Sequence, residues 1–419
     1  MSNTLPLLRK SYHRDQVFVA GGQPTVTYVQ RQDQHIERNL ARAIATPNQI
    51  VSLAGPTKTG KTVLCRRVLG RREYVWIDGG QVSSGVQLWA RVASELKIPD
   101  EVTTSAADQG AFELEGQIPL VLTASGSLIR TDTRSERRSV NSMAEAISAM
   151  LKDNAILVID DFHYLPDEAR TEVMRNVKGA VFSGLKVLLL SVTHRAFDAI
   201  RAETELTGRF IAIQLPHWNI EDLRKIAEFG FEALNVQCPS EIIQNLVDEA
   251  QENPFLMQKF CWEICFDLNI ENTARLSAHQ IPDDYDLRPM YERLAEDAGL
   301  PIYQQLAAGP QSRKVRAKRP LRNGNNADIY EVILLALAET GPKPAVSYDE
   351  LRTALTNLLA DMVPQKHEIT AALKHLAVIA RKIGAESAID WDETKREINV
   401  ADPYLRFYLR WKVRHRNGD

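Results

Sequence analysis

The sequence contains little cysteine and almost no excess charge. Four of its 419 residues are cysteines, and their spacing fits neither a metal site nor a disulfide framework. Cys261 and Cys265 stand four residues apart in an apolar helical pattern, which favours core positions and a reducing environment. The formal net charge of −3 argues against a protein that wraps nucleic acid over its whole surface, although it leaves local basic patches open.

Long apolar runs are also absent. No segment has the roughly 18 consecutive apolar residues that a membrane-spanning helix needs. Residues 1–6 lack the apolar region of a secretory signal. We therefore expect a cytoplasmic protein without a membrane partner. A chain of 419 residues exceeds the size of one hydrophobic core, so we expect two or three domains.

One stretch organises the rest of the chain. It lies between the apolar run 50–54 and the helical pattern 63–69, and it reads Gly55-Pro56-Thr57-Lys58-Thr59-Gly60-Lys61-Thr62. Strand, glycine-bounded loop and helix form the context of the phosphate-binding loop GxxxxGK[ST]. Backbone N–H groups must converge on an anion there, and the tightest bends tolerate no Cβ. We expect the loop and the following Val63 to bind ATP, with Lys61 on the β- and γ-phosphates and Thr62 on Mg²⁺.

A second apolar run, residues 155–159, ends in Asp160 and Asp161. Five apolar residues without alternation predict a parallel strand that is buried on both faces. The carboxyl end of such a strand lies where open α/β sheets bind ligands. We expect Asp160 to hold Mg²⁺, directly or through water, and Asp161 to orient and deprotonate the attacking water.

A third strand pattern, residues 186–193, ends in polar groups. A polar side chain here would lie beside the γ-phosphate, and Ser191, Thr193 and Arg195 compete for that position. Thr193 also fits an N-cap of the next helix. The sequence does not decide among the three.

Arg209 stands before a further predicted strand, residues 211–215. A planar guanidinium that is always charged suits a phosphate, so Arg209 is a candidate arginine finger. The alternative is an ion pair with a local carboxylate such as Glu203 or Glu205.

Two other segments allow two interpretations each. Residues 28–31 are a candidate for the adenine edge, or else a lead-in strand that covers the edge of the sheet. Residues 99–139 are polar and predict an insertion with a possible hairpin at 120–131 and a basic end. That insertion is either a solvated loop or a hairpin that touches a partner or DNA. A capping box at Ser142 and Glu145 predicts the start of the next helix.

Residues 219–267 predict only helices: one capped by Asn219, one that Ser240 opens, and one capped by Asn253 with Pro254 in its first turn. The N-terminus of that last helix could face the nucleotide. Residues 270–326 are less regular. Within them, residues 313–322 carry six cations and no acid. This basic arm is either a hydrated linker or a segment that binds phosphates.

The C-terminal part predicts three amphipathic helices, two short strands around a polar turn, and a last helix that starts at Asp402-Pro403. Three helices followed by a hairpin form a winged-helix arrangement, whose third helix enters the major groove in DNA readers. From residue 326 onward there are 13 Lys/Arg and 14 Asp/Glu, which is not the charge of a strong DNA binder. Protein contact or autoinhibition is an equal alternative.

The order of these parts resembles the AAA+/STAND group of P-loop ATPases, which includes signal-transduction and origin-licensing ATPases. The resemblance is carried by the phosphate loop, the strand ending in Asp160-Asp161, the strand through Thr193, Gly208-Arg209-Phe210, Asn253-Pro254 and the trailing winged helix. It implies a lid that closes on ATP, an arginine that completes a neighbour's site, and Pro254 near the adenine. Asp161 stands where many AAA+ members carry Glu, which favours the STAND group. The lead-in lacks the usual glycine before Arg31, and no sensor repeat array is visible.

We therefore expect an α/β fold with a parallel P-loop NTPase sheet covered by helices on both faces. The expected domains are the ATPase domain (1–216, with the insertion near 99–139), a helical lid (217–270), a linker with the basic arm (271–325) and a winged-helix domain (326–419). The leading hypothesis is an ATP- and Mg²⁺-dependent switch that controls self-association or binding of a protein partner. The alternative is an ATP-dependent DNA-binding protein or loader that uses the winged helix and the basic arm. A scaffold that binds nucleotide without useful turnover is a third possibility.

Overall fold

The computed structural model describes residues 10–31, 35–98, 133–196, 199, 208–311, 315–383 and 388–414. The predicted hairpin at 120–131, most of the predicted insertion, and Glu203 and Glu205 lie outside the described residues. Within the described ranges, none of the helices combines the length and the apolar character that crossing a membrane requires.

The N-terminal half is built on a parallel five-stranded sheet in the order β2-β3-β4-β1-β5. The strands are β1 (Ile50–Ala54), β2 (Tyr74–Asp78), β3 (Ile156–Asp160), β4 (Lys186–Ser191) and β5 (Phe210–Gln214). Strands β1, β3 and β4 are almost wholly buried, as strands covered on both faces must be. Because all strands run in one direction, the phosphate loop after β1, the two aspartates after β3 and the polar residues after β4 meet at one edge.

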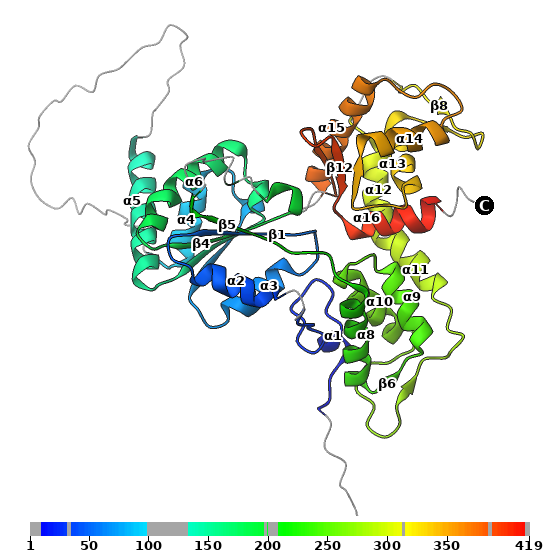
Figure 1. The fold of residues 1–419 in the computed structure, drawn as a ribbon, viewed down its shortest axis with the longest axis horizontal. Helices are drawn as coiled ribbons and strands as arrows, with labels where there is room; N and C mark the ends of the chain where they lie inside the picture. Colours follow the sequence, from blue (N-terminus) through cyan, green and yellow to red (C-terminus); the bar gives the residue numbers. More distant parts are fainter. Residues whose placement is uncertain are drawn as a thin grey trace, which may run out of the picture.

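Helices cover both faces of this sheet, as expected, and Figure 1 shows the two layers. Helices α2 (Ile36–Ala45) and α3 (Lys61–Leu69) pack on one face. Helices α4 (Gly85–Glu95), α5 (Thr133–Lys152) and α6 (Asp167–Phe182) pack on the other. Helix α5 begins at Thr133 and not at the predicted capping box of Ser142, because that box lies inside a longer amphipathic pattern.

A helical body follows the sheet and contains α8 (Ile220–Leu234), α9 (Ser240–Glu249) and α10 (Pro254–Asp267). Asn219 and Asn253 cap α8 and α10 as predicted. The lead-in is the segment before β1 that contains α1 (Arg14–Val17), Phe18 and Val29. It packs here too, because these residues belong to the same buried cluster as the three helices. The short strands β6 (Val236–Gln237) and β7 (His279–Gln280) pair beside them.

Residues 270–326 are more regular than the sequence indicates. Helix α11 (Arg288–Leu294), a π-helical turn (Ala295–Gly299) and α12 (Leu300–Ala308) follow one another without a break. The core of the helical body of α8, α9 and α10, which is the lid, includes Met290, Tyr291 and Leu294. The core of the C-terminal part includes Leu306. This helical segment therefore joins two hydrophobic cores, where we expected a linker.

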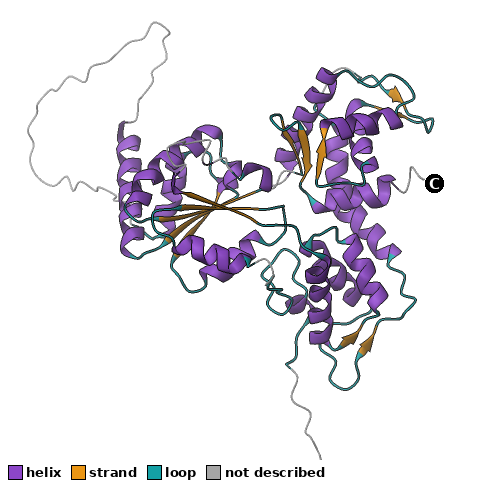
Figure 2. Cartoon of the chain, viewed as in Figure 1, coloured by secondary structure: helices purple, strands orange, loops and turns teal. Residues whose placement is uncertain are grey.

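The C-terminal part has winged-helix topology and forms a separate body in Figure 2. Its helices are α13 (Ile329–Glu339), α14 (Tyr348–Leu358) and α15 (Lys366–Ile383). Strands β10 (Ala345–Ser347), β11 (Ile389–Asp392) and β12 (Glu397–Val400) form a sheet in the order β10-β12-β11. Helix α16 (Pro403–Tyr408) continues into a π-helical segment (Leu409–Arg414). The strand β10 was not predicted, because three residues are too few to show alternation.

The described part of the basic arm packs on the winged helix. Its strand β8 (Arg319–Pro320) pairs with β9 (Asn326–Ala327). Arg316 lies 2.9 Å from a carboxylate oxygen of Asp328, and Arg319 lies 3.1 Å from one of Glu368. Two of the arm's cations are therefore neutralised within the chain, while residues 313 and 314 lie outside the described ranges.

Candidate functional site

A cavity of about 820 Å³ opens between the sheet edge, the lead-in and the lid. The phosphate loop contributes residues 58–63, strand β3 contributes Asp160 and Asp161, and the lid contributes Pro254. The lead-in contributes residues 27–31. This volume is in the range of small-molecule and cofactor sites, and the cavity joins segments that are far apart in the sequence.

The two glycines of the loop are required for different reasons, close approach at Gly55 and a left-handed backbone at Gly60. A Cβ on Gly55 would lie 2.7 Å from Cβ of Leu215, so the loop can approach the end of β5 only with glycine. Gly60 has a φ of +93°, and a Cβ added there would have nothing within 4 Å, so this residue turns the chain into α3 beside open space. The resulting loop directs the first N–H groups of α3 toward the cavity.

Lys61 is buried and donates from Nζ to two carbonyls of its own loop, Gly55 O at 3.1 Å and Pro56 O at 2.9 Å. Its ammonium therefore lies at the centre of the loop. A phosphate group in the loop would give this ammonium a charge-assisted partner, which is stronger than a neutral carbonyl.

Thr62 and Asp160 meet at the sheet edge, although they are far apart in the sequence. The Thr62 hydroxyl donates to Oδ2 of Asp160 at 3.0 Å, and the Asp161 N–H donates to Oδ1 at 3.0 Å. Burial raises the pKa of the Asp160 carboxyl, and these two hydrogen bonds and the nearby Lys61 charge oppose that effect. A hydroxyl and a partly desolvated carboxylate are hard oxygen donors of the kind that Mg²⁺ prefers.

Asp161 adopts a left-handed backbone conformation with a φ of +50°, which Asp tolerates better than most residues. Gly79, at the end of β2, lies directly against this turn. A Cβ there would be 2.7 Å from the Asp161 carbonyl oxygen and 2.9 Å from that of Asp160. Gly79 therefore sets the position of both aspartates, and the sequence shows it only as the residue that stops a strand.

Segments outside the sheet hold the phosphate loop from two sides. Asn253, the N-cap of α10, donates from Nδ2 to Thr57 O at 3.3 Å, while its Oδ1 accepts the N–H groups of Phe255 and Leu256. Trp218 donates from Nε1 to Thr59 O at 3.0 Å. These bonds fix two peptide planes of the loop with their carbonyls toward the lid. The role of Trp218 was not predicted, because no motif in the neighbouring sequence indicates it.

The lead-in borders the same cavity. Arg31 is 8% exposed, lies over the Trp218 ring at 5.0 Å and donates to Pro216 O at 3.1 Å. Burial is the main cause that lowers the pKa of its guanidinium to about 10. Gln258 of α10 donates to the Thr27 hydroxyl at 2.7 Å. Polar bonds thus join the lead-in to the lid beside the cavity.

The three candidates at the end of β4 lie in different surroundings. Thr193 is exposed, lies in a helical turn after the strand and is not among the described residues that line the cavity. Ser191 pairs in register with Ala54 and is 2% exposed, and its hydroxyl has no hydrogen-bond partner in the described part of the chain. Arg195 points away to the winged helix.

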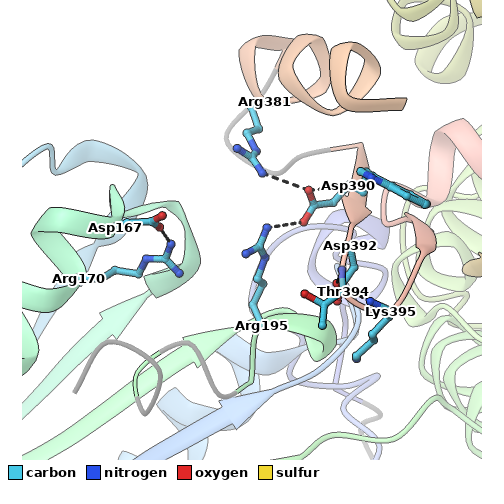
Figure 3. A network of polar contacts seen from close by, with 9 residues as sticks. Asp167, Arg170, Arg195, Arg381, Asp390, Asp392, Thr394 and Lys395 are labelled. Carbon is cyan, nitrogen blue, oxygen red and sulfur yellow. Dashed lines mark hydrogen bonds and ion pairs between the residues drawn. The ribbon is translucent and has the colours of Figure 1, made fainter. Parts of the chain in front are cut away.

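Figure 3 shows Arg195 and Arg381 both directed at Asp390 of β11. The two guanidinium groups lie 3.1 and 3.2 Å from its carboxylate oxygens, and Asp390 is 6% exposed. The turn after β4 is thereby connected to the winged-helix sheet through a buried carboxylate.

Arg209 is not brought into the cavity. Phe210 pairs with Ile50, the first residue of β1, whereas the phosphate loop follows the last residue of that strand. Arg209 therefore lies at the opposite end of the edge strand β5, with its guanidinium 4.8 Å from the ring of Phe182.

The residues present fit a nucleoside triphosphate with a divalent cation. The loop combines the N-terminus of α3, a buried lysine and Gly55, without which its approach to the end of β5 would be blocked. Thr62 and Asp160 supply adjacent oxygen donors. Within the described residues, no cluster of three or more His, Cys, Asp or Glu side chains suggests another metal site. Cys261 and Cys265 are buried core residues, as predicted.

Comparison with known proteins identifies one domain type. Residues 44–196 match the family model described as "AAA domain". None of the curated proteins matches the chain.

Several solved structures are similar in fold. A Walker-type ATPase of Pyrococcus abyssi is 15% identical, with 92% of this chain and 100% of that chain covered and a TM-score of 0.53. Cdc6p of Pyrobaculum aerophilum is 12% identical, with 96% and 98% covered and a TM-score of 0.45. The Orc1 protein of Aeropyrum pernix, solved in complex with DNA, is 12% identical, with 98% and 99% covered and a TM-score of 0.46.

Proposed function

We propose that the chain is an ATP- and Mg²⁺-dependent molecular switch, and the match of residues 44–196 to the AAA domain model supports this proposal. Nucleotide binding and hydrolysis change how the lid and the winged helix lie against the sheet. That change controls self-association or the binding of a protein partner. The proposed division of the chain is the ATPase domain (1–216), lid (217–270), connecting segment (271–325) and winged helix (326–419).

One observation carries this proposal: the cavity has the sheet edge on one side and the lid with the lead-in on the other. A nucleotide in the cavity touches both bodies at once. Its binding free energy therefore depends on their relative position, and by linkage their position depends on the nucleotide.

The proposed roles follow from the positions of the side chains. The loop from Gly55 to Val63 encloses the phosphates, and Lys61 neutralises the β- and γ-phosphates. Thr62 and Asp160 hold Mg²⁺, which when bound stabilises the charge that develops on the phosphate oxygens. Asp161 orients the attacking water and accepts its proton.

The remaining candidates have distinct proposed roles. Pro254 borders the adenine, since it lines the cavity on the lid side. Ser191, like Thr193 and Arg195, is not among the described residues that line the cavity. It is the preferred γ-phosphate sensor because its buried hydroxyl lies between the ends of β1 and β3. Arg209 acts on a neighbouring copy of the chain, because it lies far along β5 from its own phosphate loop.

The test combines nucleotide affinity with turnover. Lys61→Ala is expected to abolish ATP binding, and Asp161→Ala is expected to keep binding and to reduce turnover by about a hundredfold or more. Lys97→Ala, at an exposed lysine after α4, is the control. If neither site variant changes ATP binding or hydrolysis, the proposal is wrong.

Self-association has its own measurement. Native mass spectrometry with a slowly hydrolysed ATP analogue is expected to show a larger assembly than with ADP. In the assembled state, Arg209→Ala should lower turnover without lowering the ATP affinity of the monomer. A monomer under all nucleotide conditions would contradict this part of the proposal.

DNA binding is the second candidate, and the winged-helix topology supports it. The exposed cations of α15 include Lys366, Lys374, Arg381 and Lys382. Against it, Lys374 and Arg381 are paired with carboxylates, as are Arg316 and Arg319 of the basic arm. The DNA alternative requires an affinity that falls steeply with salt and a slope that flattens when the arm is neutralised. A flat salt dependence would exclude it.

A further inference from the structure

Lys58 is an unusual residue inside the phosphate loop. Its φ is +58°, a left-handed conformation that favours glycine because a Cβ crowds the backbone there. The loop nevertheless carries a long cationic side chain at this position. Residues that are held in such conformations at ligand sites are often held there for a function, so the surroundings of the side chain are informative.

The Lys58 side chain lies between the cavity and the C-terminal part of the chain. Its Nζ is 3.0 Å from Oδ2 of Asp402, the N-cap of α16, and the side chain is 26% exposed. The ammonium also lies 5.1 Å from the ring centre of Phe255 and 5.0 Å from that of Tyr404. Lys58 and Phe255 line the cavity, whereas Asp402 is not among the described residues that line it.

Asp402 keeps other partners if the lysine leaves. Its Oδ1 accepts the N–H of Leu405 at 2.9 Å, which caps α16. Arg406, one turn along the helix, is 5% exposed and interacts electrostatically with Asp402. The carboxylate is therefore stabilised within its own helix, and the pair with Lys58 can break without leaving a buried charge alone.

The lid itself offers no charge to the cavity. Its described lining residues are apolar or neutral: Trp218, Ile226, Pro254, Phe255 and Gln258. The neighbouring contacts of the loop, from Asn253 to Thr57 and from Trp218 to Thr59, go to backbone carbonyls. Lys58 is thus a cation of the phosphate loop that faces the lid, and Arg31 of the lead-in is another cation in the lining of the cavity.

We propose that Lys58 is a second phosphate-binding lysine, which exchanges Asp402 for the terminal phosphates of a nucleoside triphosphate and thereby detaches the start of α16 from the phosphate loop. This inference rests on the proposed function. Terminal phosphates carry more negative charge than one carboxylate, and they lie in the loop that holds the lysine backbone. The ion pair in this structure therefore competes with the nucleotide for one ammonium group.

Because Asp402 and the nucleotide compete for Lys58, substitutions of Lys58 and of Asp402 should change the affinity for the nucleotide in opposite directions. Lys58→Ala removes a charge-assisted phosphate contact and should weaken the affinity for a slowly hydrolysed ATP analogue about tenfold. Asp402→Asn retains an N-cap residue but releases the lysine, and should strengthen the affinity about threefold. In the double variant, the Asp402→Asn gain should disappear.

Two matched controls separate this effect from general damage. Lys97 has a φ of +55°, follows the end of α4 and is not among the described residues that line the cavity, so Lys97→Ala should leave the affinity unchanged. Asp328 is the N-cap of α13 and is paired with Arg316 at 2.9 Å, so Asp328→Asn changes a similar pair that does not touch the loop. Unfolding midpoints of all variants should show that they are folded.

A second readout follows α16 directly. Amide hydrogen exchange in residues 404–408 should accelerate when the analogue is added to the wild-type chain, and should already be fast in Asp402→Asn. Unchanged or weaker affinity in Asp402→Asn, or unchanged affinity in Lys58→Ala, would overturn the inference and indicate a static tether. Lys61→Ala, measured in parallel, distinguishes this failure from failure of the proposed function, because only the latter leaves Lys61→Ala binding ATP normally.

Discussion

Gly79 provides a test of how the two aspartates are positioned. Its Cβ in a Gly79→Ala variant would lie 2.7 Å from the Asp161 carbonyl oxygen, 2.9 Å from that of Asp160 and 3.1 Å from the Asp161 carbonyl carbon. All three are backbone atoms, so no flexible side chain can move aside. The end of β3 must shift away from β2 to accept one methyl group.

The size of the effect follows from this crowding. Overpacking by a methyl group against backbone costs about 1–3 kcal/mol of unfolding free energy. A shift of a few tenths of an ångström at Asp160 lengthens its 3.0 Å contact with Thr62. Because a misplacement of about 1 Å can cost a hundredfold in rate, we expect turnover to fall by about tenfold or more.

Urea unfolding and steady-state ATP turnover at saturating Mg²⁺ measure the two effects. Gly179, which is exposed in the interior of α6 with nothing within 4 Å of an added Cβ, is the matched control. Gly179→Ala should stabilise the chain by about 0.5–1 kcal/mol and leave turnover unchanged. Wild-type stability and turnover in Gly79→Ala would refute the argument that this glycine positions the aspartates.

Substitutions centred on Asn253, Asp390 and Glu350 test other parts of the structure. Asn253→Ala removes the cap of α10 and should destabilise the chain by about 1–2 kcal/mol in urea unfolding, whereas Asn253→Asp keeps a cap but loses the donor to the loop and should mainly weaken nucleotide affinity. Asp390→Asn leaves two guanidinium groups without their buried carboxylate and should lower the unfolding free energy by about 2 kcal/mol. This loss should exceed that of Arg195→Ala. Equal losses would contradict the role of Asp390 as a bridge between Arg195 and Arg381. Hydrogen bonds from Lys343 and then from Ser347 lower the pKa of Glu350 from 4.5 to about 2. Because the pKa of Glu350 is lower in the folded than in the unfolded chain, its ionised form stabilises the folded state. The difference in melting temperature between wild type and Glu350→Gln should therefore be full above pH 4.5 and shrink as the pH falls toward 2. Melting temperatures in a pH series measure this difference.

Local signals made much of the fold predictable. The loop at 55–62, the unbroken apolar strand before Asp160, and the caps Asn219 and Asn253 each depend on a few neighbouring residues, and the structure has these elements where the sequence indicates them. Less local features were missed. The helical segment 288–308 joins two hydrophobic cores, and its apolar pattern divides its faces between them, so no single periodic stripe marks it in the sequence.

The residues of the candidate site also fall into two groups, those that could be named from the sequence and those that could not. Lys61, Thr62 and Asp160 could be named from residue type and spacing, because parallel strands place their carboxyl ends at one edge whatever surrounds them. Gly79, Trp218 and Asp402 could not, because their roles depend on approach distances and on which body packs beside the loop.

The sequence by itself determined that this chain has a phosphate-binding loop, a parallel sheet, a helical lid and a winged helix, because each is encoded in short-range pattern and chemistry. Only the tertiary structure decided that the lead-in packs with the lid, that Arg209 lies away from the cavity, and that Lys58 is paired with a carboxylate 344 residues further along the chain. These outcomes depend on the packing of separate hydrophobic cores against one another, and residue spacing contains no information about that packing.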